Sequence, residues 1–248
     1  MNPVTGPAII LRCLAYGEAD RIVTFLSRDH GLLKGFARSA RTSRKRFGAA
    51  LEPLAETVLC WRQPQRGTLV DLQEAEGGNL HLELRRDLEV VALASYGCEL
   101  VEGLCAEEQP CPEVFAVVRA FLAYLDTQPA TPETRLLMEL RLLSLSGYAP
   151  HLTNCCRCGG PLGEQTVPLD IPGGALCRRC AASDHTPSIS LPTLGSLARS
   201  LRTRPTLFAG FRFSPRTLEE AGILVSLLLH HHLQTLPKSL SLLTPDRS

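Results

Sequence analysis

The sequence predicts an α+β protein of more than one domain, in which a small antiparallel β-barrel is followed by an α-helical region. In the first part of the chain, short apolar runs alternate with turn residues and leave no room for crossover helices. After Gly77–Asn79 the apolar residues recur every three or four positions, which is typical of amphipathic helices. Two closely spaced cysteine pairs then interrupt the helical region. We therefore expect a barrel domain over residues 1–80 and a helical domain over residues 81–248, with a cysteine-rich insertion at about residues 150–185.

Five short strands account for the barrel. The apolar runs are rich in β-branched and aromatic residues, and turn residues at Tyr16–Asp20 and Asp29–Gly31 separate the first three. A turn around Pro64 and Gly67 joins the last two strands as a hairpin. The expected strands are Ala8–Leu14, Arg21–Leu26, Leu32–Ala37, Thr57–Trp61 and Thr68–Leu72.

The helices are placed by their apolar period and by capping residues. One stripe of apolar residues from Leu84 to Val101 predicts the first helix. Thr131 with Pro132 is a typical helix start, and Gly147 can end that helix in the left-handed conformation. A second helix is expected to open at Cys111–Glu113 and run towards Asp126. The remaining helices are expected at Leu191–Leu201 and Thr217–Leu236, the last of these central to a second core, and Pro237–Ser248 is expected to fray.

The charge is unevenly distributed along the chain. The formal net charge is only +1, which taken alone argues against a nucleic-acid ligand. However, residues 1–81 carry +3, residues 82–150 carry −6 and residues 151–248 carry +4. One basic segment begins within the third strand and continues into the loop after it, and arginine forks suit phosphate oxygens, although a solvated surface loop is the simpler alternative. Its candidate phosphate ligands are Lys34, Arg38, Arg41, Arg44, Lys45 and Arg46.

Aromatic residues of the barrel are candidates for stacking on bases. Tyr16, Phe36, Phe47 and Trp61 are available, and some of them must belong to the barrel core.

The cysteine pairs predict a metal site. Cys155 and Cys158 form one C-x-x-C pair, Cys177 and Cys180 form another, and eighteen residues separate the pairs, as in a four-cysteine zinc ribbon. Four thiolates complete a tetrahedron, so we expect one structural Zn²⁺ per chain and no coordination position for substrate. Scattered thiols are the alternative, and Cys156 or His185 are less suitable ligands.

Common catalytic motifs are missing from the sequence. It contains no G-x-x-x-x-G-K-[ST], G-x-S-x-G, H-E-x-x-H or G-x-G-x-x-G pattern, and no metal site is expected at the consecutive histidines His230–His232. We therefore expect no enzyme, the weaker alternative being a nuclease that uses Glu18, Asp20 or Asp71. No apolar run is long enough to span a membrane and no secretory signal is evident, so a cytoplasmic protein is expected.

With these features in place, the sequence resembles the RecO family of bacterial recombinational repair proteins. The resemblance extends over essentially the whole chain in order and spacing. The matching segments are Ala8–Leu11, Tyr16–Val23, Gly31–Leu32, Ala37–Arg41, Phe47–Pro53 and Leu142–Pro150 leading into the cysteine pairs.

The resemblance implies an amino-terminal OB-fold barrel, a helical domain that carries the zinc ribbon, and a function without covalent catalysis. It implies binding of single- and double-stranded DNA, annealing of complementary strands, and loading of RecA with RecR onto DNA coated by single-strand-binding protein, in the RecF pathway at the nucleoid. The basic segment then becomes the expected DNA surface. An alternative that shares the local features is a zinc-ribbon module for protein interaction or RNA binding in transcription or translation.

Overall fold

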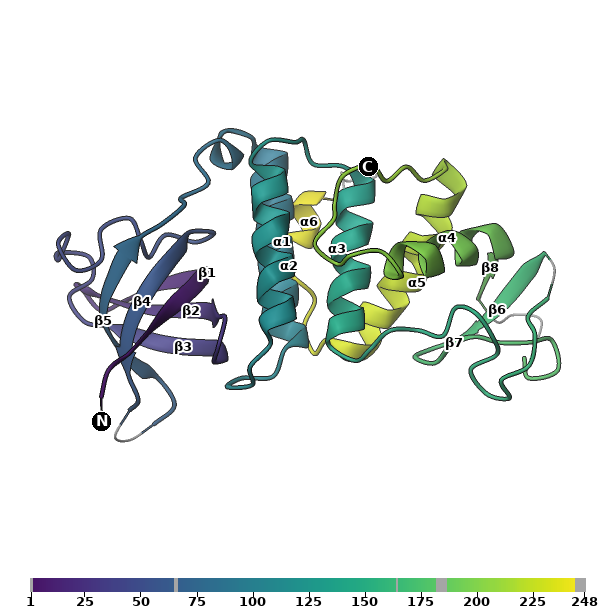
Figure 1. Ribbon diagram of the computed structural model, residues 1–248, viewed down its shortest axis with the longest axis horizontal. Helices are drawn as coiled ribbons and strands as arrows, with labels where there is room; N and C mark the ends of the chain where they lie inside the picture. The colour runs from purple at the N-terminus through teal and green to yellow at the C-terminus, as the bar shows by residue number, and fades with distance from the viewer. Residues whose placement is uncertain (1, 65–66, 164, 182–186, 244–248) are drawn as a thin grey trace. The chain divides into compact units, whose positions relative to one another are not determined.

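The computed structural model describes residues 2–64, 67–163, 165–181 and 187–243 (Figure 1). By its internal contacts the chain forms two compact units. Unit 1 runs to Pro129 and takes up the chain again from Pro237, whereas unit 2 runs from Ala130 to Leu236. The domain boundary expected after residue 80 lies inside unit 1, where it separates the barrel from the helices, and it stays a prediction.

Five strands close into a barrel at the start of unit 1 (Figure 1). Their order around the barrel is β1-β2-β3-β5-β4, and the pairing of β3 with β5 is parallel while the others are antiparallel. A closed five-stranded barrel of this order is an OB fold, which confirms the predicted fold class. The strands are β1 (Val4–Tyr16), β2 (Asp20–Ser27), β3 (Gly31–Ala37), β4 (Glu56–Arg62) and β5 (Val70–Gly77).

The last strand differs from its prediction. It begins at Val70 and reaches Gly77, whereas the expected strand ended at Leu72. The polar residues Glu74 and Glu76 concealed the extension. They alternate with Ala75, which packs inside the barrel, so the inward side of the strand stays apolar.

The segment between β3 and β4 fills one end of the barrel. Residues 38–51 form turns, as expected for a loop, but their apolar residues other than Ala49 are buried. Phe47 and Leu51 belong to the same core cluster as Phe25 and Trp61. The basic segment is therefore anchored to the barrel by its own apolar residues, which pack into the barrel core.

The outer face of β1, β2 and β3 carries three cross-strand rows of side chains. The first row, Ile9–Leu26–Leu32, is buried although it lies outside the barrel's interior cluster. Helix α1 (Leu88–Leu104) packs against β1, and the loop that follows α1 pairs with β3 at Leu32 and Glu107. The helical part of unit 1 thus covers part of this barrel face.

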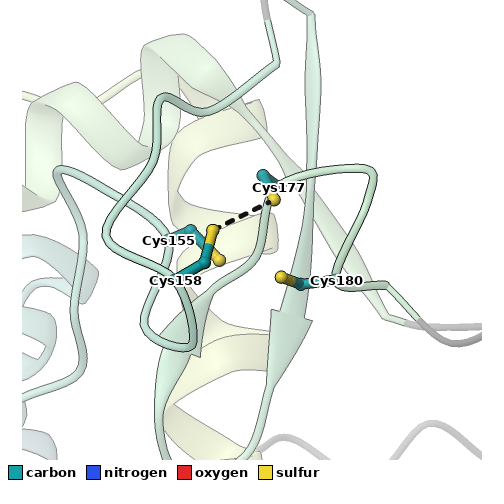
Figure 2. A group of neighbouring side chains, drawn as sticks. All are labelled: Cys155, Cys158, Cys177 and Cys180. Carbon is teal, nitrogen blue, oxygen red and sulfur yellow. Dashed lines mark hydrogen bonds between the residues drawn. The ribbon is translucent and has the colours of Figure 1, made fainter.

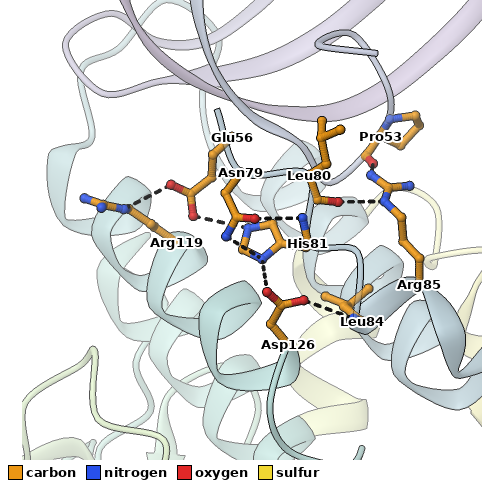
Figure 3. A network of polar contacts seen from close by, with 9 residues as sticks. All are labelled: Pro53, Glu56, Asn79, Leu80, His81, Leu84, Arg85, Arg119 and Asp126. Carbon is orange, nitrogen blue, oxygen red and sulfur yellow. Dashed lines mark hydrogen bonds and ion pairs between the residues drawn. The ribbon is translucent and has the colours of Figure 1, made fainter. Parts of the chain in front are cut away.

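A buried histidine joins the barrel to the helices of unit 1 (Figure 3). His81 Nε2 lies 3.2 Å from a Glu56 carboxylate oxygen, and its Nδ1 lies 3.4 Å from Asp126. Arg119 donates to the second Glu56 oxygen at 3.1 Å, and the His81 backbone N–H donates to Asn79 at 2.9 Å. Every polar atom of the imidazole therefore has a partner, as a buried polar group requires.

The first predicted helix is divided in two. Leu84–Arg86 form a single 3₁₀ turn, and α1 begins only after Asp87, whose extended backbone interrupts the helix. The Asp87 carboxylate accepts hydrogen bonds from the N–H groups of Glu89 and Val90, as an N-cap does. The apolar stripe continued through this break, so the period alone could not show it.

The expectation that Pro237–Ser248 frays is wrong for residues 237–243, and residues 244–248 lie outside the described residues. Helix α6 (Leu240–Leu243) contacts α1, and the backbone N–H of Lys238 donates to the Glu99 carboxylate. Unit 1 also holds α2 (Pro112–Leu125), close to the predicted helix.

Unit 2 consists of three longer helices and a small sheet. In helix α3 (Pro132–Leu145) the predicted amino-terminal cap is confirmed, since the Thr131 hydroxyl accepts from the Thr134 N–H. Gly147, beyond the end of this helix, has a φ of +83°. Helix α5 (Pro215–His232) contacts both other helices, as expected of a central helix, although it ends before the predicted Leu236 and Ile223 is half exposed. The elements are α3 (Pro132–Leu145), β6 (Thr166–Asp170), β7 (Gly174–Ala175), β8 (Ser188–Ser190), α4 (Leu191–Leu201) and α5 (Pro215–His232).

In the described part of the chain, no helix combines the length and apolar character that crossing a membrane would require.

Candidate metal centre and nucleic-acid interface

The four predicted cysteine ligands converge in unit 2 (Figure 2). The sulfurs of Cys155, Cys158, Cys177 and Cys180 all lie within 4.8 Å of one another, and the Cys158 and Cys177 sulfurs are 3.6 Å apart. In a tetrahedral Zn–S₄ site with bonds of about 2.3 Å, sulfurs stand about 3.8 Å apart. The cluster therefore has the size and the donor set of a site for a thiophilic metal ion.

Each cysteine pair is held by its own tight turn. In the first, the Cys155 N–H donates to the Gly160 carbonyl and the Gly159 N–H donates to the Cys155 carbonyl, both at 2.9 Å. In the second, the Cys180 N–H donates to the Cys177 carbonyl at 3.0 Å. These turns aim the two sulfurs of each pair to one side, which is why two residues must separate them.

Arg157 links the two turns, and its role could not be read from the sequence. Its Nε donates to Asp170 at 2.9 Å, and its Nη1 donates to the Cys180 carbonyl at 3.2 Å. The guanidinium thus connects the first cysteine turn with β6 and with the second turn. The only sequence signal was its position inside the C-x-x-C pair.

Hydrogen bonds among the four cysteines make their acidities unequal. The Cys177 backbone N–H is the main cause that lowers the pKa of Cys155 to about 6. Conversely, Cys180 shares its proton with the sulfurs of Cys177 and Cys158, which raises the pKa of Cys180 to about 12. One thiol therefore ionises readily while another keeps its proton, and a bound metal ion would replace the shared protons.

The cysteines outside this set are not part of the cluster. Cys156 lies next to the first ligand, but its N–H donates to the Ala175 carbonyl and its sulfur is not among the four that converge. His185, the other alternative ligand, lies outside the described residues. Cys98 is buried on α1, as expected, and burial raises the pKa of its thiol to about 12.

The basic segment is fastened to the turn between β1 and β2. The Arg41 N–H donates to the Ala19 carbonyl and Arg41 Nη1 donates to the Glu18 carbonyl, both at 2.9 Å. The Ser39 N–H donates to the Asp20 carboxylate at 2.7 Å. The basic residues therefore sit on a defined surface of the barrel.

The six predicted phosphate ligands differ in how free their charges are. Lys34 forms an ion pair with Glu107 at 2.5 Å. Arg46 donates to the Arg38 carbonyl at 2.7 Å and to the Ser43 hydroxyl, and its guanidinium lies over the Phe47 ring. By contrast, Arg38, Arg44 and Lys45 are exposed, and within the described ranges none of them forms an ion pair.

The carboxylates of the nuclease alternative do not form a metal site. Asp20 accepts from the Ser39 N–H, and Asp71 accepts from the Gln73 side chain at 2.7 Å. Over the residues that the structure describes, the four cysteines are the one cluster of three or more side chains suited to a metal. The geometry therefore gives no support to a nuclease site.

The four barrel aromatics divide into two pairs. Trp61 and Phe47 are buried in the core, whereas Tyr16 is exposed and Phe36 is half-buried on the outer surface. The sequence could not separate the buried rings from the exposed ones, because the side of the sheet on which a ring lies depends on the strand register.

These features define an OB-barrel protein with a basic surface segment and a helical unit that carries a four-cysteine metal centre. Two family models match the chain. The model described as "Recombination protein O N terminal" matches residues 1–80, and that described as "Recombination protein O C terminal" matches residues 85–241.

Curated relatives agree with this match. "DNA repair protein RecO" of Syntrophotalea carbinolica is 47% identical over 98% of this chain and 95% of its own length. The proteins of the same name from Pelobacter propionicus and Myxococcus xanthus are 38% and 34% identical, over 82% and 94% of this chain and 81% and 93% of their own lengths. The chain belongs to the RecO family of DNA repair proteins.

Proposed function

We propose that this chain is a non-catalytic recombination mediator that binds single- and double-stranded DNA and anneals complementary strands. The observation that carries this proposal is the set of free, exposed cations Arg38, Arg44 and Lys45 on an OB barrel. OB folds bind oligonucleotides through one barrel face and its loops, and cations on such a surface neutralise the repulsion between two phosphate backbones. Annealing on this surface needs charge and position but no nucleotide hydrolysis.

The family membership supports the finer part of the proposal. This finer part is that the chain acts with RecR at the nucleoid to load RecA onto DNA coated by single-strand-binding protein. The metal in the cysteine cluster is proposed to be one structural Zn²⁺, because four thiolates at tetrahedral spacing leave no position for water or substrate.

A strand-annealing assay tests the proposal. Complementary oligonucleotides coated with single-strand-binding protein are mixed with the purified chain, with and without RecR, and duplex formation is followed by fluorescence transfer. We expect annealing without ATP. In a parallel reaction that adds RecA and ATP to the coated strand, we expect RecA filaments only when both the chain and RecR are present. Binding of RNA in clear preference to DNA of the same sequence, with no annealing, would favour the RNA-binding alternative instead.

A further inference from the structure

One end of the outer barrel face stays uncovered. The third cross-strand row, Leu14–Ile22–Phe36, lies beyond the rows that the helical part of unit 1 covers. Leu14 is 50% exposed, and Tyr16, two residues along the same strand, is 56% exposed. These are large apolar side chains on a surface that a barrel of this kind uses for ligands.

Elsewhere on this face the side chains are either paired with the helical part of unit 1 or buried. In the middle row, Arg12 pairs with Glu102 of α1 at 2.6 Å, and Lys34 pairs with Glu107 of the loop that follows α1. Thr24 between them is buried, as is the whole first row. The large apolar side chains that this face exposes are therefore those of the third row and Tyr16.

Tyr16 and Phe36 form an aromatic pair there. Their ring centroids are 5.6 Å apart and their planes are inclined at 82°, an edge-to-face contact. Phe36 is placed outward because Leu33 and Ala37, on the opposite side of β3, belong to the barrel core. The contact holds the tyrosine ring in one orientation while more than half of the residue stays open to solvent.

The basic segment lies beside this pair. Tyr16 pairs with Asp20 across the β1–β2 turn, and the Asp20 carboxylate accepts from the Ser39 N–H. Arg41 is bonded to the carbonyls of Glu18 and Ala19 in the same turn. The Arg41 cation and the Tyr16 ring are thus held at the same turn of the chain.

We propose that Tyr16, held by Phe36, is a stacking platform for a base of single-stranded DNA whose phosphates contact the basic segment. The inference rests on the proposed function, since it assumes that the barrel binds DNA. Stacking needs an unpaired base with an accessible face, so the platform distinguishes single strands from duplexes, whereas the cations attract both. Tyr16 is the contact residue, and Phe36 is its positioning residue.

The test compares two oligonucleotides of equal length and charge, oligo(dT) and a fully abasic strand, by fluorescence anisotropy with the full chain. Tyr16→Ala is expected to weaken oligo(dT) binding about 5- to 150-fold, the range that stacking of one base supplies, and to leave abasic binding unchanged. Tyr16→Phe keeps a ring and should bind as the wild type does. Tyr148→Ala removes an exposed tyrosine of unit 2 and is the matched control.

A second variant gives a direct signal that does not depend on affinity. The only natural tryptophan, Trp61, is buried, so Tyr16→Trp adds an exposed indole. Its fluorescence should be quenched by oligo(dT) and not by the abasic strand. This readout also serves if Tyr16→Ala fails to fold.

The outcomes separate the two proposals. If the wild type binds both strands, Tyr16→Ala binds oligo(dT) equally well and the new indole is not quenched, the stacking platform is wrong while DNA binding by the barrel stands. If the wild type binds neither strand, the proposed function fails and the platform fails with it. Tighter binding of oligo(U) than of oligo(dT) through Tyr16 would overturn DNA as the ligand.

Discussion

At the residue scale, Cys158 and its neighbour Cys156 offer a direct test of the metal centre. Cys158 is one of the four converging sulfurs, and Cys156 is not. Cys158→Ser should lose the bound metal and destabilise unit 2 by on the order of a few kcal/mol, because the binding free energy of a structural metal is folding free energy. Cys156→Ser should keep one zinc per chain. Elemental analysis and thermal unfolding of both variants check this, and no thiophilic metal in the wild type would refute the site.

Arg44 tests the basic segment. Because its charge is exposed and unpaired among the described residues, Arg44→Glu should weaken oligonucleotide binding about 3- to 10-fold near about 0.1 M salt and reduce the salt slope by about one. Arg86→Glu makes the same charge change at an exposed residue next to α1 and is the control. Titrations at several salt concentrations measure both values. Equal affinity of the two variants would exclude the segment as the phosphate surface.

Residue types with fixed spacing were predictable from the sequence, whereas their surroundings were not. Two residues between cysteines are enough to predict the ligands, because a tight turn sets that spacing. The run of cations was equally visible, but Lys34 is neutralised by Glu107, which lies far along the chain. Nothing local to Lys34 indicates this pairing, so only the folded structure separates the free cations from the paired ones.

At the scale of elements, the start of α4 depends on a carboxylate from α5. Glu220 accepts from the Ser190 N–H at 2.9 Å and from the Ser190 hydroxyl at 2.6 Å. Burial acts to raise the pKa of Glu220, but hydrogen bonds from Ser190, Thr193 and Arg216 outweigh it and lower the pKa to about 2. A carboxyl group with a lowered pKa stabilises the folded state above its unfolded pKa, and this stability is lost as the pH falls.

We therefore expect Glu220→Gln to lower stability by about 1–3 kcal/mol at pH 7, where the wild-type carboxylate is fully charged. The difference from the wild type should shrink as the pH falls below the ordinary value of 4.5 towards 2. Melting temperatures across this pH range measure the effect. Glu219→Gln, at the exposed neighbouring position, should show no such difference, and a constant gap between Glu220→Gln and wild type would contradict the assignment.

Gly31 determines how the loop after α1 fits against β3. Its φ is +72°, and a Cβ at this position would lie 1.8 Å from the Gln109 carbonyl oxygen. Gly17 also has a positive φ, of +57°, but a Cβ there would meet nothing within 4 Å. Gly31→Ala should therefore destabilise the chain by more than about 1 kcal/mol beyond Gly17→Ala, which carries the conformational cost alone. Denaturant unfolding of the two variants measures the loss of stability in each. Equal losses would show that the loop after α1 shifts to accommodate the added methyl group.

Element types followed from period and capping residues, and the exceptions have long-range causes. Thr131 and Gly147 marked the ends of α3 locally. By contrast, the 3₁₀ turn before α1 is fixed by Asp126, which accepts from the Leu84 N–H. The segment before α6 is held by Glu99 of α1. Such contacts join residues far apart in sequence, where a periodic pattern carries no information.

At the scale of the whole molecule, the net charge of +1 combines parts of opposite sign, with acids concentrated in residues 82–150. Some of these acids pair with the barrel, as Glu102 does with Arg12 and Glu107 with Lys34. The acidic region thus neutralises cations on the covered barrel face and leaves those of the basic segment free. Net charge was therefore a poor guide to the ligand, whereas the local charge of the segment indicated it.

The metal centre and the basic segment belong to different units, each with its own buried residues around the feature. The cysteines pack with Leu176 in unit 2, whereas the basic segment is anchored by Phe47 in the barrel core of unit 1. Because neither core contains residues of the other, loss of one feature should leave the other intact. We expect Cys158→Ser to lose its metal yet bind oligo(dT) with wild-type affinity, and Arg44→Glu to bind DNA weakly yet retain one zinc per chain.

Metal content and binding isotherms measured on the same preparations of both variants check this independence, with the wild type as reference. A Cys158→Ser chain that keeps its melting transition for unit 1 but no longer binds oligo(dT) would show that the cysteine turns contact DNA themselves. Arg178 and Arg179, which are exposed within the second turn, would then be the next residues to replace by glutamate. Unchanged binding would confine the DNA surface to the barrel and assign the metal a purely structural role.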